Sequence, residues 1–501
     1  LFRSENEISI RLRATQQNPS VLPAESLYAI EHDTMDTTFR SMYQGLYIYL
    51  SARKERRDLL LSQRPPRFDE SLDSMISRSE DDFTRIALKA KAAQDYFLLI
   101  GPPGTGKTSC ALKKMVETFH ADKDAQILLL SYTNRAVDEI CKSLASIAPA
   151  VDFIRVGSEL SCDEAYRGHL IENELSSCNR RSEVYERIRN CRIIVGTVAA
   201  ISGKPELFRL KHFDVAIIDE ATQILEPQLL GILCARGEDG KDAIDKFVLI
   251  GDHKQLPAVV QQNTEQSAIY DESLLSIGLT NLKDSLFERL YRNCTATVHR
   301  SYDMLCRQGR MHPEVALFAN RAFYGGRLIP VGLPHQIESS DTICRLAFYP
   351  SVPEKAGASA KINYSEARIV ADLAARIYED HQTDFDESRT LGIITPYRSQ
   401  IALIKKEIES LGIPALNRIL VDTVERFQGS ERDVIIYSFC VNYPYQLKFL
   451  SNLTEEEGVL IDRKLNVALT RARKQMFITG VPELLERNPL YKSLLKLIES
   501  F

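Results

Sequence analysis

Short apolar runs alternate with amphipathic segments over most of the chain. From about residue 83 onward, runs typical of buried strands recur at residues 96–100, 127–130, 192–195, 214–218 and 247–250, and helical spacing fills the stretches between them. Strands that alternate with helices in this way predict a parallel sheet wrapped by helices. The predicted fold class of this part of the chain is therefore α/β.

A second set of apolar runs follows residue 281. Strand-like runs lie at 391–395, 419–422, 433–439 and 475–479, and helical patterns lie between them. The pattern predicts a second α/β lobe, joined to the first near residues 261–281. We expect an accessory segment at 1–80, a first lobe at 81–262 with a helical insertion at about 158–190, and a second lobe at 263–501.

The first 80 residues follow another pattern. Residues 8–13 alternate like a strand within a sheet, and helical apolar spacing follows at positions such as Phe39, Leu46 and Leu50. We expect a partial barrel and a helical stalk in this segment. Because the strand-like pattern begins so close to Leu1, we also expect the chain to start inside a domain of a longer polypeptide.

Composition narrows the class of protein. The 501 residues are 44% hydrophobic and 26% charged, which is ordinary for a soluble globular protein of about two to four domains. The net charge of −5 gives no overall attraction to nucleic acid, although a local basic channel is compatible with it. The ten cysteines form no C-x-x-C pair, which argues against a zinc site or a disulfide framework. No apolar run nears the roughly 18 residues of a membrane span, so we expect no membrane partner and a cytoplasmic protein, or a nuclear one in a eukaryote.

Residues 101–108 read GPPGTGKT and follow the strand-like run YFLLI. They match the phosphate-binding loop pattern G-x-x-x-x-G-K-[ST], in which glycines let backbone N–H groups surround an anion. Lys107 is expected to reach the β- and γ-phosphates, and the Thr108 hydroxyl to bind Mg²⁺. The pattern predicts that ATP or another nucleoside triphosphate binds with Mg²⁺ at Gly101, Pro102, Pro103, Gly104, Thr105, Gly106, Lys107, Thr108 and Ser109.

Two further strand ends carry the polar groups that such a site needs. Residues 215–220 read VAIIDE, in which Asp219 would hold the Mg²⁺ shell beside Thr108, and Glu220 would orient and deprotonate the attacking water. An acidic strand end alone is a weak signal, and its pairing with the phosphate loop strengthens it. Gln255, in GDHKQLP, also follows a strand-like run and can contact both a γ-phosphate and the attacking water.

Ten motifs in order make the chain similar to superfamily 1 helicases, in the group of the nonsense-mediated-decay RNA helicase and the replication nuclease–helicase. The resemblance spans about residues 83–480, and the stretch upstream is more similar to the nuclease–helicase branch. The motifs are GPPGTGKT (101–108), SYTNRAVDE (131–139), GT (196–197), DEATQ (219–223), GDHKQLP (251–257), SLFERL (285–290), QGRMHP (308–313), ITPYRSQ (394–400), VDTVERFQGSERDVII (421–436) and LNVALTRAR (465–473).

The resemblance implies two RecA-like P-loop NTPase lobes with ATP between them. The second lobe would supply Arg310 and Arg471 as arginine fingers against the γ-phosphate. A guanidinium is a planar and permanent cation, and it would reach the phosphate only when the lobes close. Glu431, in FQGSERD, resembles the carboxylate that contacts the ribose in this family.

The resemblance also implies a nucleic-acid track across both lobes. Hydroxyl, amide and backbone groups would hold phosphates and riboses without reading bases. For Tyr397, stacking on a base and packing in the core both remain open. The track residues implied by the resemblance are Thr133, Asn134, Thr197, Thr395, Pro396, Tyr397 and Thr423.

Two departures from the family pattern concern the base of the nucleotide. Gly309 stands where family members usually have an aromatic residue, and no glutamine stands near Asp82 and Phe83, where the family often reads the adenine edge. These departures imply relaxed nucleotide-base selectivity, or an adenine pocket built from other residues.

The leading hypothesis is an ATP-dependent 5′-to-3′ helicase and translocase on single-stranded nucleic acid, with DNA favoured over RNA. The polarity and the DNA preference rest on the resemblance alone. An RNA helicase of the decay branch and a non-unwinding NTPase switch that clamps nucleic acid are the alternatives. The branch resemblance also leads us to expect a nuclease domain or a partner upstream of Leu1.

Overall fold

The structure is a computed structural model that describes residues 2–3, 8–9, 37–297, 300–338, 343–354, 359–456 and 458–500. The chain divides into one unit of residues 1–40 and another of residues 41–501. In the first unit, β1 (Phe2–Arg3) pairs antiparallel with β2 (Ile8–Ser9). Most of the predicted partial barrel lies outside the described residues.

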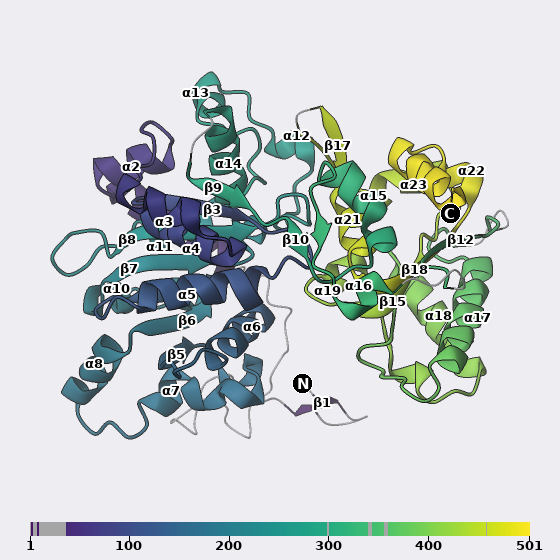
Figure 1. Cartoon of the computed structure of the whole chain (residues 1–501), viewed down its shortest axis with the longest axis horizontal. Coiled ribbons are helices and arrows are strands. Elements are labelled where there is room, and N and C mark those ends of the chain that lie inside the picture. Colours follow the sequence, from purple (N-terminus) through teal and green to yellow (C-terminus); the bar gives the residue numbers. More distant parts are fainter. Residues whose placement is uncertain are drawn as a thin grey trace, which may run out of the picture. The chain divides into compact units, whose positions relative to one another are not determined.

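The first large sheet is parallel throughout, with the strand order β5-β6-β4-β7-β8-β3-β9 (Figure 1). Each of the five predicted strand-like runs of the first lobe lies in it, which confirms the α/β class. The strands are β3 (Tyr96–Ile100), β4 (Ile127–Ser131), β5 (Phe153–Val156), β6 (Ile193–Thr197), β7 (Phe213–Ile218), β8 (Ile244–Gly251) and β9 (Tyr302–Met304).

Helices cover both faces of this sheet, because successive residues of a strand point to opposite faces and here both sides are apolar. Phe97 and Leu99 lie in one core, and Leu98 and Ile100 lie in the other. The first core is covered by α4 (Asp82–Ala92), α5 (Lys113–His120) and α6 (Asn134–Ala145). The second is covered by α8 (Arg181–Asn190), α9 (Val198–Ser202), α10 (Glu206–Leu210), α11 (Glu226–Leu233) and α14 (Leu286–Ala296).

The second large sheet is also parallel and has the order β12-β18-β15-β13-β14. Its strands are β12 (Leu346–Pro350), β13 (Leu391–Ile394), β14 (Leu420–Asp422), β15 (Arg432–Ser438) and β18 (Ala472–Gly480). One face packs against α17 (Tyr364–Asp380) and α18 (Arg398–Ser410). The other packs against α15 (Pro313–Phe323), α21 (Arg463–Leu469) and α23 (Pro489–Glu499).

The remaining elements are short. The strand pairs are β10 (Arg307–Gln308) with β11 (Ile329–Pro330), and β16 (Leu453–Glu456) with β17 (Val459–Asp462). The helices are α2 (Lys54–Leu60), α3 (Asp73–Arg78), α7 (Ile171–Glu174), α12 (Thr264–Ser267), α13 (Glu272–Ser276), α16 (Pro334–Ile337), α19 (Val424–Phe427), α20 (Leu447–Leu450) and α22 (Pro482–Leu485). None of the helices in the described part of the chain combines the length and the apolar composition needed to cross a membrane.

The first sheet extends beyond residue 262, where the sequence predicts the first lobe to end. Leu286 and Phe287 of α14 lie in the core of the first sheet, and β9 pairs with β3 as an edge strand. The chain therefore returns to the first sheet before it enters the second. A strand as short as β9 carries too few residues to show an alternating pattern. The expected insertion between β5 and β6 is mainly helical, with α7 and α8.

The stalk predicted from helical spacing is α1 (Thr37–Ser51). Its apolar stripe is largely exposed, since Tyr43 is 73% and Leu50 is 66% accessible. The contact with the first lobe is made by Ile48 and Tyr49, which pack against its core, and by Gly45, where a Cβ would lie 2.3 Å from the backbone oxygen of Pro227. A glycine is required here because the two helices approach to backbone contact.

We predict that Gly45→Ala destabilises the protein, although alanine favours a helix over glycine by about 1 kcal/mol. The new Cβ meets backbone that cannot rotate away, and overpacking of this kind costs about 1–3 kcal/mol. Thermal unfolding of purified protein measures the change. Gly168→Ala is the matched control, since a Cβ there meets nothing within 4 Å. An unfolding midpoint for Gly45→Ala at or above that of the control would contradict the prediction.

Candidate functional site

The phosphate-loop residues lie between β3 and a π-helical turn at Lys107–Leu112. Gly104 and Gly106 have φ values of +74° and +75°, a conformation that glycine adopts at little cost. The Lys107 stem lies over Gly101, since a Cβ on Gly101 would be 2.0 Å from Lys107 Cγ. The loop thus has the open backbone that close approach of an anion requires.

The acidic residues predicted at the end of β7 lie beside this loop. The Thr108 hydroxyl donates to Asp219 Oδ2 at 2.5 Å, and Lys107 Nζ is 3.9 Å from Glu220 Oε1. Burial, together with the adjacent Glu220 carboxylate, raises the pKa of Asp219 to about 6. Glu220 has a φ of +53°, which is uncommon for a residue with a side chain and is typical of functional sites.

Gln255 lies buried at the end of β8, between the two lobes. Its Nε2 donates to Asp252 Oδ2 at 2.7 Å, and its Oε1 accepts from Arg471 Nη2 at 3.1 Å. The Tyr324 hydroxyl of the second lobe also donates to Asp252 Oδ2 at 2.7 Å. The loop after β8 is therefore held by both lobes, so its position depends on how they meet.

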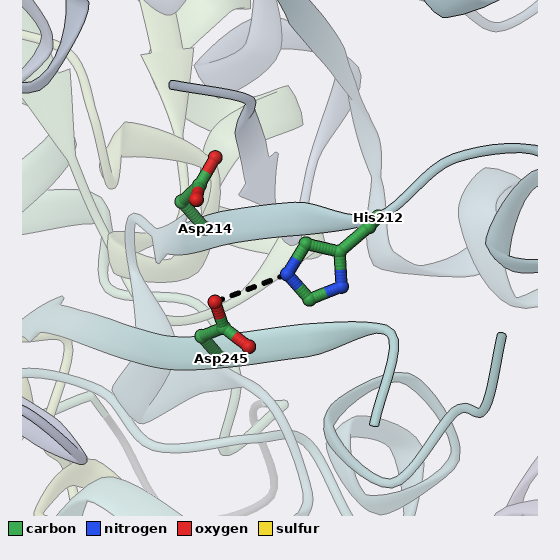
Figure 2. Close-up of side chains that lie close together, drawn as sticks. All are labelled: His212, Asp214 and Asp245. Atoms are coloured by element: carbon green, nitrogen blue, oxygen red, sulfur yellow. Dashed lines mark ion pairs between the residues drawn. The ribbon is translucent and has the colours of Figure 1, made fainter. Parts of the chain in front are cut away.

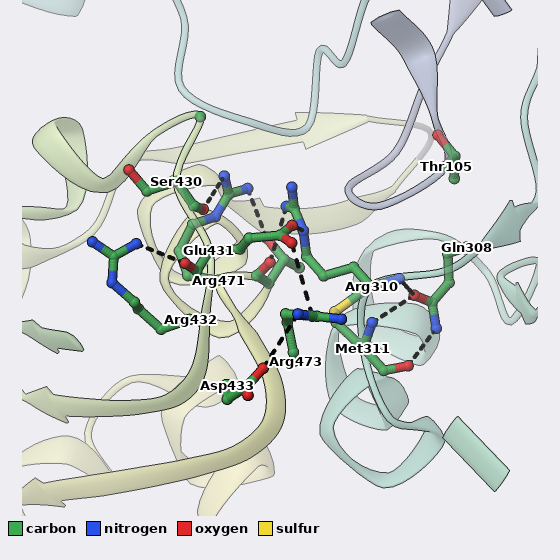
Figure 3. Close-up of polar contacts among 12 residues, drawn as sticks. Thr105, Gln308, Arg310, Met311, Ser430, Glu431, Arg432, Asp433, Arg471 and Arg473 are labelled. Atoms are coloured by element: carbon green, nitrogen blue, oxygen red, sulfur yellow. Dashed lines mark hydrogen bonds and ion pairs between the residues drawn. The ribbon is translucent and has the colours of Figure 1, made fainter. Parts of the chain in front are cut away.

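Arg310 belongs to a loop of the second lobe that touches the phosphate loop directly. The Gly309 N–H donates to the Gly104 carbonyl at 2.8 Å, and a Cβ on Gly104 would lie 2.4 Å from Arg310 Cβ. The Arg310 Nε lies 2.6 Å from Glu431 Oε2, and its Nη1 donates to the Thr470 carbonyl at 3.3 Å (Figure 3). The structure thus brings Arg310 to the phosphate loop, with its guanidinium paired to a carboxylate.

Arg471 is buried in the cleft between the lobes, where it is 2% exposed. Besides Gln255, its guanidinium donates to the carbonyls of Val467 at 3.0 Å and Ser430 at 3.4 Å. Among the described residues, no carboxylate lies within 4.0 Å of it. Burial, followed by the nearby Arg310 cation, lowers the pKa of Arg471 to about 9. This is a buried cation in need of an anion.

Glu431, expected at the ribose, is engaged elsewhere in this structure. It pairs with Arg310 and lies 3.8 Å from Arg473 Nε, in the cluster drawn in Figure 3. Burial raises the pKa of its carboxyl, but the cations of Arg310 and Arg473 outweigh burial and leave the pKa below its ordinary value. The carboxylate therefore balances the charge of one predicted finger, Arg310, and of Arg473.

The departure at Gly309 has a structural counterpart. A Cβ at this position would lie 3.2 Å from Leu333 Cδ1 and 3.4 Å from Val331 Cγ2. Both aliphatic side chains are exposed, Leu333 at 41% and Val331 at 38%. Aliphatic groups thus occupy part of the space that an aromatic side chain on residue 309 would enter.

The predicted track residues fall into two groups at the carboxyl edges of the sheets. In the first lobe, Ser131 pairs with Thr197 across β4 and β6, and this places Thr133 and Asn134 just beyond the same edge as Thr197. In the second lobe, Ile394 pairs with Asp422, so that Thr395 and Thr423 follow neighbouring strands. Each lobe therefore has its own group of hydroxyls.

The exposure of these residues differs. Thr133 is exposed and Asn134 is partly exposed, whereas Thr197 is 8% exposed and Thr395 is fully buried. The Thr133 and Thr197 hydroxyls accept backbone N–H groups at the starts of α6 and α9. The Thr395 hydroxyl has no hydrogen-bond partner in the part of the chain that the structure describes. In its present position it lies too deep for a polymer to reach.

Pro396 and Tyr397 are partly exposed beside it. The Tyr397 hydroxyl accepts from Gln446 Nε2 at 3.1 Å, and burial raises its pKa. The ring is thus held by a neighbour on one side, and the choice between stacking and core packing stays open.

One interlobe contact has no counterpart among the residues predicted from the sequence. Arg135, next to Asn134 on α6, donates from Nη1 to Ser430 Oγ at 2.9 Å and from Nη2 to the Gly429 carbonyl at 3.2 Å. In the sequence, only the position of Arg135 inside the motif SYTNRAVDE pointed to a functional role for this residue. Its partner, 295 residues away, could not be identified from the sequence alone.

A group of possible metal ligands lies at the other edge of the first sheet, away from the phosphate loop. His212, Asp214 and Asp245 bring one ligand atom each to within 4.8 Å of one another (Figure 2). The His212 Nε2 lies 3.0 Å from Asp245 Oδ2, and Asp214 accepts from the Gln126 backbone N–H at 2.6 Å. These ordinary contacts account for the group, and we assign it no function.

Two family models match the chain, and each is described as an AAA domain. One matches residues 282–483, and the other matches residues 78–184 and 171–263. The matches together cover both sheets and the cleft between them.

Curated proteins are similar over nearly the whole chain. The DNA replication ATP-dependent helicase/nuclease DNA2 of Bos taurus is 27% identical over 97% of this chain and 46% of its own length. The DNA replication ATP-dependent helicase/nuclease JHS1 of Arabidopsis thaliana is 29% identical over 98% of this chain and 36% of its own length. The DNA polymerase alpha-associated DNA helicase A of Saccharomyces cerevisiae is 24% identical over 91% of this chain and 73% of its own length. The chain thus spans less than half of the length of the first two relatives.

We predict that Arg471→Met leaves the unfolding midpoint of the ligand-free protein unchanged or higher. A base whose pKa is lowered on folding costs stability at every pH below that folded pKa, here about 9, and methionine removes this cost. Thermal unfolding at pH 7 and pH 8 measures the midpoint.

Arg471→Lys is the matched control, since it keeps a buried cation but loses the planar fork. The lysine variant is expected to unfold at a lower temperature than the methionine variant. If Arg471→Met unfolds at a lower temperature than Arg471→Lys, the buried charge at residue 471 does not lower the stability of the ligand-free protein, and the prediction is contradicted.

Proposed function

Since the chain belongs to the superfamily 1 helicases, in their nuclease–helicase group, we propose that it is an ATP-dependent helicase and translocase acting on single-stranded DNA. The proposal takes the direction to be 5′ to 3′. It concerns the two lobes of this chain and their own residues.

The observation that carries the proposal is the contact between Arg471 of the second lobe and Gln255 of the first, at 3.1 Å. A buried cation with no carboxylate partner among the described residues thus meets the loop after β8 of the opposite lobe. A γ-phosphate held by the first lobe would form an ion pair with Arg471 of the second lobe and so connect the two lobes. Hydrolysis would then remove the link, so that chemistry and lobe movement become one event.

The phosphate loop supports binding of the triphosphate. Its backbone N–H groups and Lys107 would hold the β- and γ-phosphates. The Thr108 hydroxyl and the Asp219 carboxylate lie 2.5 Å apart, and this oxygen donor pair fits Mg²⁺, which prefers oxygen ligands. When bound, Mg²⁺ would neutralise phosphate charge.

Glu220 and Gln255 are the residues proposed to handle the attacking water. Glu220 Oε2 accepts from Gln223 Nε2 at 2.9 Å, which fixes the carboxylate at the end of β7. From there it would accept the proton of the water. Gln255 can donate to the γ-phosphate and accept from the water, and its bond to Arg471 would pass the loss of phosphate to the second lobe.

Arg310 would change its partner during the cycle. In the structure its Nε lies 2.6 Å from Glu431, a carboxylate that is 44% exposed. A triphosphate carries more negative charge than one carboxylate and would compete for this cation. Glu431, once released, is free to accept from a ribose hydroxyl, which is the role expected from the family.

The nucleotide base would meet an aliphatic surface. Val331 and Leu333 occupy the space next to Gly309, and an aliphatic contact has no directional groups with which to distinguish bases. This supports relaxed base selectivity, as the sequence predicts.

The two groups of hydroxyls support a track that crosses both lobes. Thr133 and Asn134 at the start of α6 offer a hydroxyl, an amide and a helix N-terminus to a phosphate. Thr197, Thr395, Pro396, Tyr397 and Thr423 complete the proposed track, with Thr395 becoming accessible only if the loop after β13 shifts. Each lobe would bind the strand at its own group of residues, and movement of the lobes would change the distance between the two groups.

Two other functions are weighed against this one. An RNA helicase would use the same motor residues, and the names of the similar proteins favour DNA. A non-unwinding switch that clamps nucleic acid would also close on ATP. The complete set of Lys107, Glu220, Gln255, Arg310 and Arg471 favours a motor that turns over.

We predict that single-stranded DNA stimulates steady-state ATP hydrolysis, and RNA does so less. Lys107→Ala should lose nucleotide binding and turnover. Glu220→Gln should bind ATP normally but turn over at least about 100-fold more slowly, because the general base is lost. Exposed Lys123 provides the control variant Lys123→Ala. Turnover that ignores both polymers in the wild type would rule out the translocase.

A second prediction concerns movement along the strand. With ATP the protein should displace streptavidin from the 3′ end of a single strand and unwind a duplex with a 5′ tail. Glu220→Gln, which should bind but not turn over, is the control. Displacement only from 5′ ends would reverse the polarity. Polymer-stimulated hydrolysis without displacement or unwinding would favour the clamp.

A further inference from the structure

Arg135 stands where the proposed polymer track meets the second lobe. It is the second residue of α6 and directly follows Thr133 and Asn134. Its guanidinium makes two hydrogen bonds outside its own lobe, to Ser430 Oγ at 2.9 Å and to the Gly429 carbonyl at 3.2 Å. A single side chain thus joins the start of α6 to two consecutive residues of the opposite lobe.

The segment that Arg135 contacts, residues 429–431, also contacts both proposed arginine fingers. The Ser430 carbonyl accepts from Arg471 Nη1 at 3.4 Å, and Glu431 lies 2.6 Å from Arg310 Nε. The next residue, Arg432, donates its N–H to the Arg471 carbonyl at 3.0 Å. The 429–431 segment is therefore a direct connection between α6 and the γ-phosphate side of the nucleotide site.

The charges around Arg135 favour a contact that can break and form again. Among the described residues Arg135 has no ion-pair partner within 4.0 Å, and its acceptors are a hydroxyl and a carbonyl. Arg432 lies nearby, and its pKa is lowered by burial and next by the Arg135 cation. Repulsion between these two cations opposes the two hydrogen bonds, so the contact is not locked.

We propose that Arg135 is a positioning residue that couples the polymer track to the arginine fingers. The proposal rests on the proposed function. Polymer at Thr133 and Asn134 would fix α6, and Arg135 would then hold the 429–431 segment where Arg310 and Arg471 can meet the γ-phosphate. Without polymer, the Arg135 contact would form less often, and the fingers would be placed less often.

A different role must be separated from this one. An exposed arginine beside a track could simply bind a polymer phosphate. In that case a lysine would serve nearly as well, and the loss would appear in polymer affinity and in its salt dependence. A residue that positions the 429–431 segment needs the planar fork with its paired donors, and lysine cannot replace it.

The test compares Arg135→Ala, Arg135→Lys, Ser430→Ala and the Arg135→Ala/Ser430→Ala double variant. Ser430→Ala removes the acceptor hydroxyl and leaves the Ser430 carbonyl in place. Lys142→Ala is the matched control, because Lys142 is an exposed cation on the same helix. For each protein, ATP turnover is measured without polymer and with saturating oligothymidylate. Oligothymidylate affinity is measured without nucleotide over a series of salt concentrations.

We expect both Arg135 variants to lower the ratio of stimulated to unstimulated turnover at least about fivefold, which is in the range of ordinary coupling between sites. Oligothymidylate affinity without nucleotide should change by less than about twofold, as for a surface substitution. The double variant should be no worse than Arg135→Ala alone, because both changes break the same contact. Lys142→Ala should match the wild type.

Three results would overturn the coupling role. The first is an unchanged stimulation ratio in Arg135→Ala. The second is full rescue by lysine together with a weaker oligothymidylate affinity in Arg135→Ala, which would make Arg135 a phosphate contact. The third is strict additivity of the two single variants. A wild type without any polymer stimulation would instead refute the proposed function, and the coupling role with it.

Discussion

The site depends on a backbone contact between the lobes. The Gly309 N–H donates to the Gly104 carbonyl, so a loop of the second lobe lies against the phosphate loop of the first. The Arg471–Gln255 bond lies in the same cleft. Neither sheet alone contains the whole proposed site, because the groups proposed to bind the triphosphate and the cations that would stabilise its terminal charge come from different lobes. In the proposed function, lobe closure would therefore be part of the chemistry.

The cleft keeps costly groups that a structural interface would avoid. Asp219 and Arg471 are buried with their pKa values shifted toward their neutral forms, and Glu220 has a left-handed backbone. Each of these features lowers the stability of the ligand-free protein. In the proposed function they would become favourable when a polyanion with its cation binds between the lobes. Part of the free energy of binding would thus offset the strain at Glu220 and the desolvation of Asp219 and Arg471. Binding at the site would therefore depend on how the two lobes are arranged.

Much of the fold and of the nucleotide site could be predicted from the sequence, because the patterns that indicate them lie within short stretches of the chain. Buried parallel strands read as continuous apolar runs, and the polar residues at their ends, such as Asp219 and Gln255, follow directly along the chain. Contacts between distant segments left no such signal. The edge strand β9 has three residues, and the partner of Arg135 lies in another lobe. The pairing of Glu431 with Arg310 and the burial of Thr395 likewise depend on packing that no local pattern encodes.

Gly104 meets two separate demands at one position. Its positive φ shapes the loop around the phosphates, and its missing side chain admits Arg310 Cβ to a place 2.4 Å from where a Cβ would stand. The approach of the lobes at this point is therefore limited by main chain and by the Arg310 Cβ. The distance between the two loops does not vary with the choice of side-chain rotamer. With a nucleotide bound, the separation of the lobes would therefore depend on the size of that nucleotide.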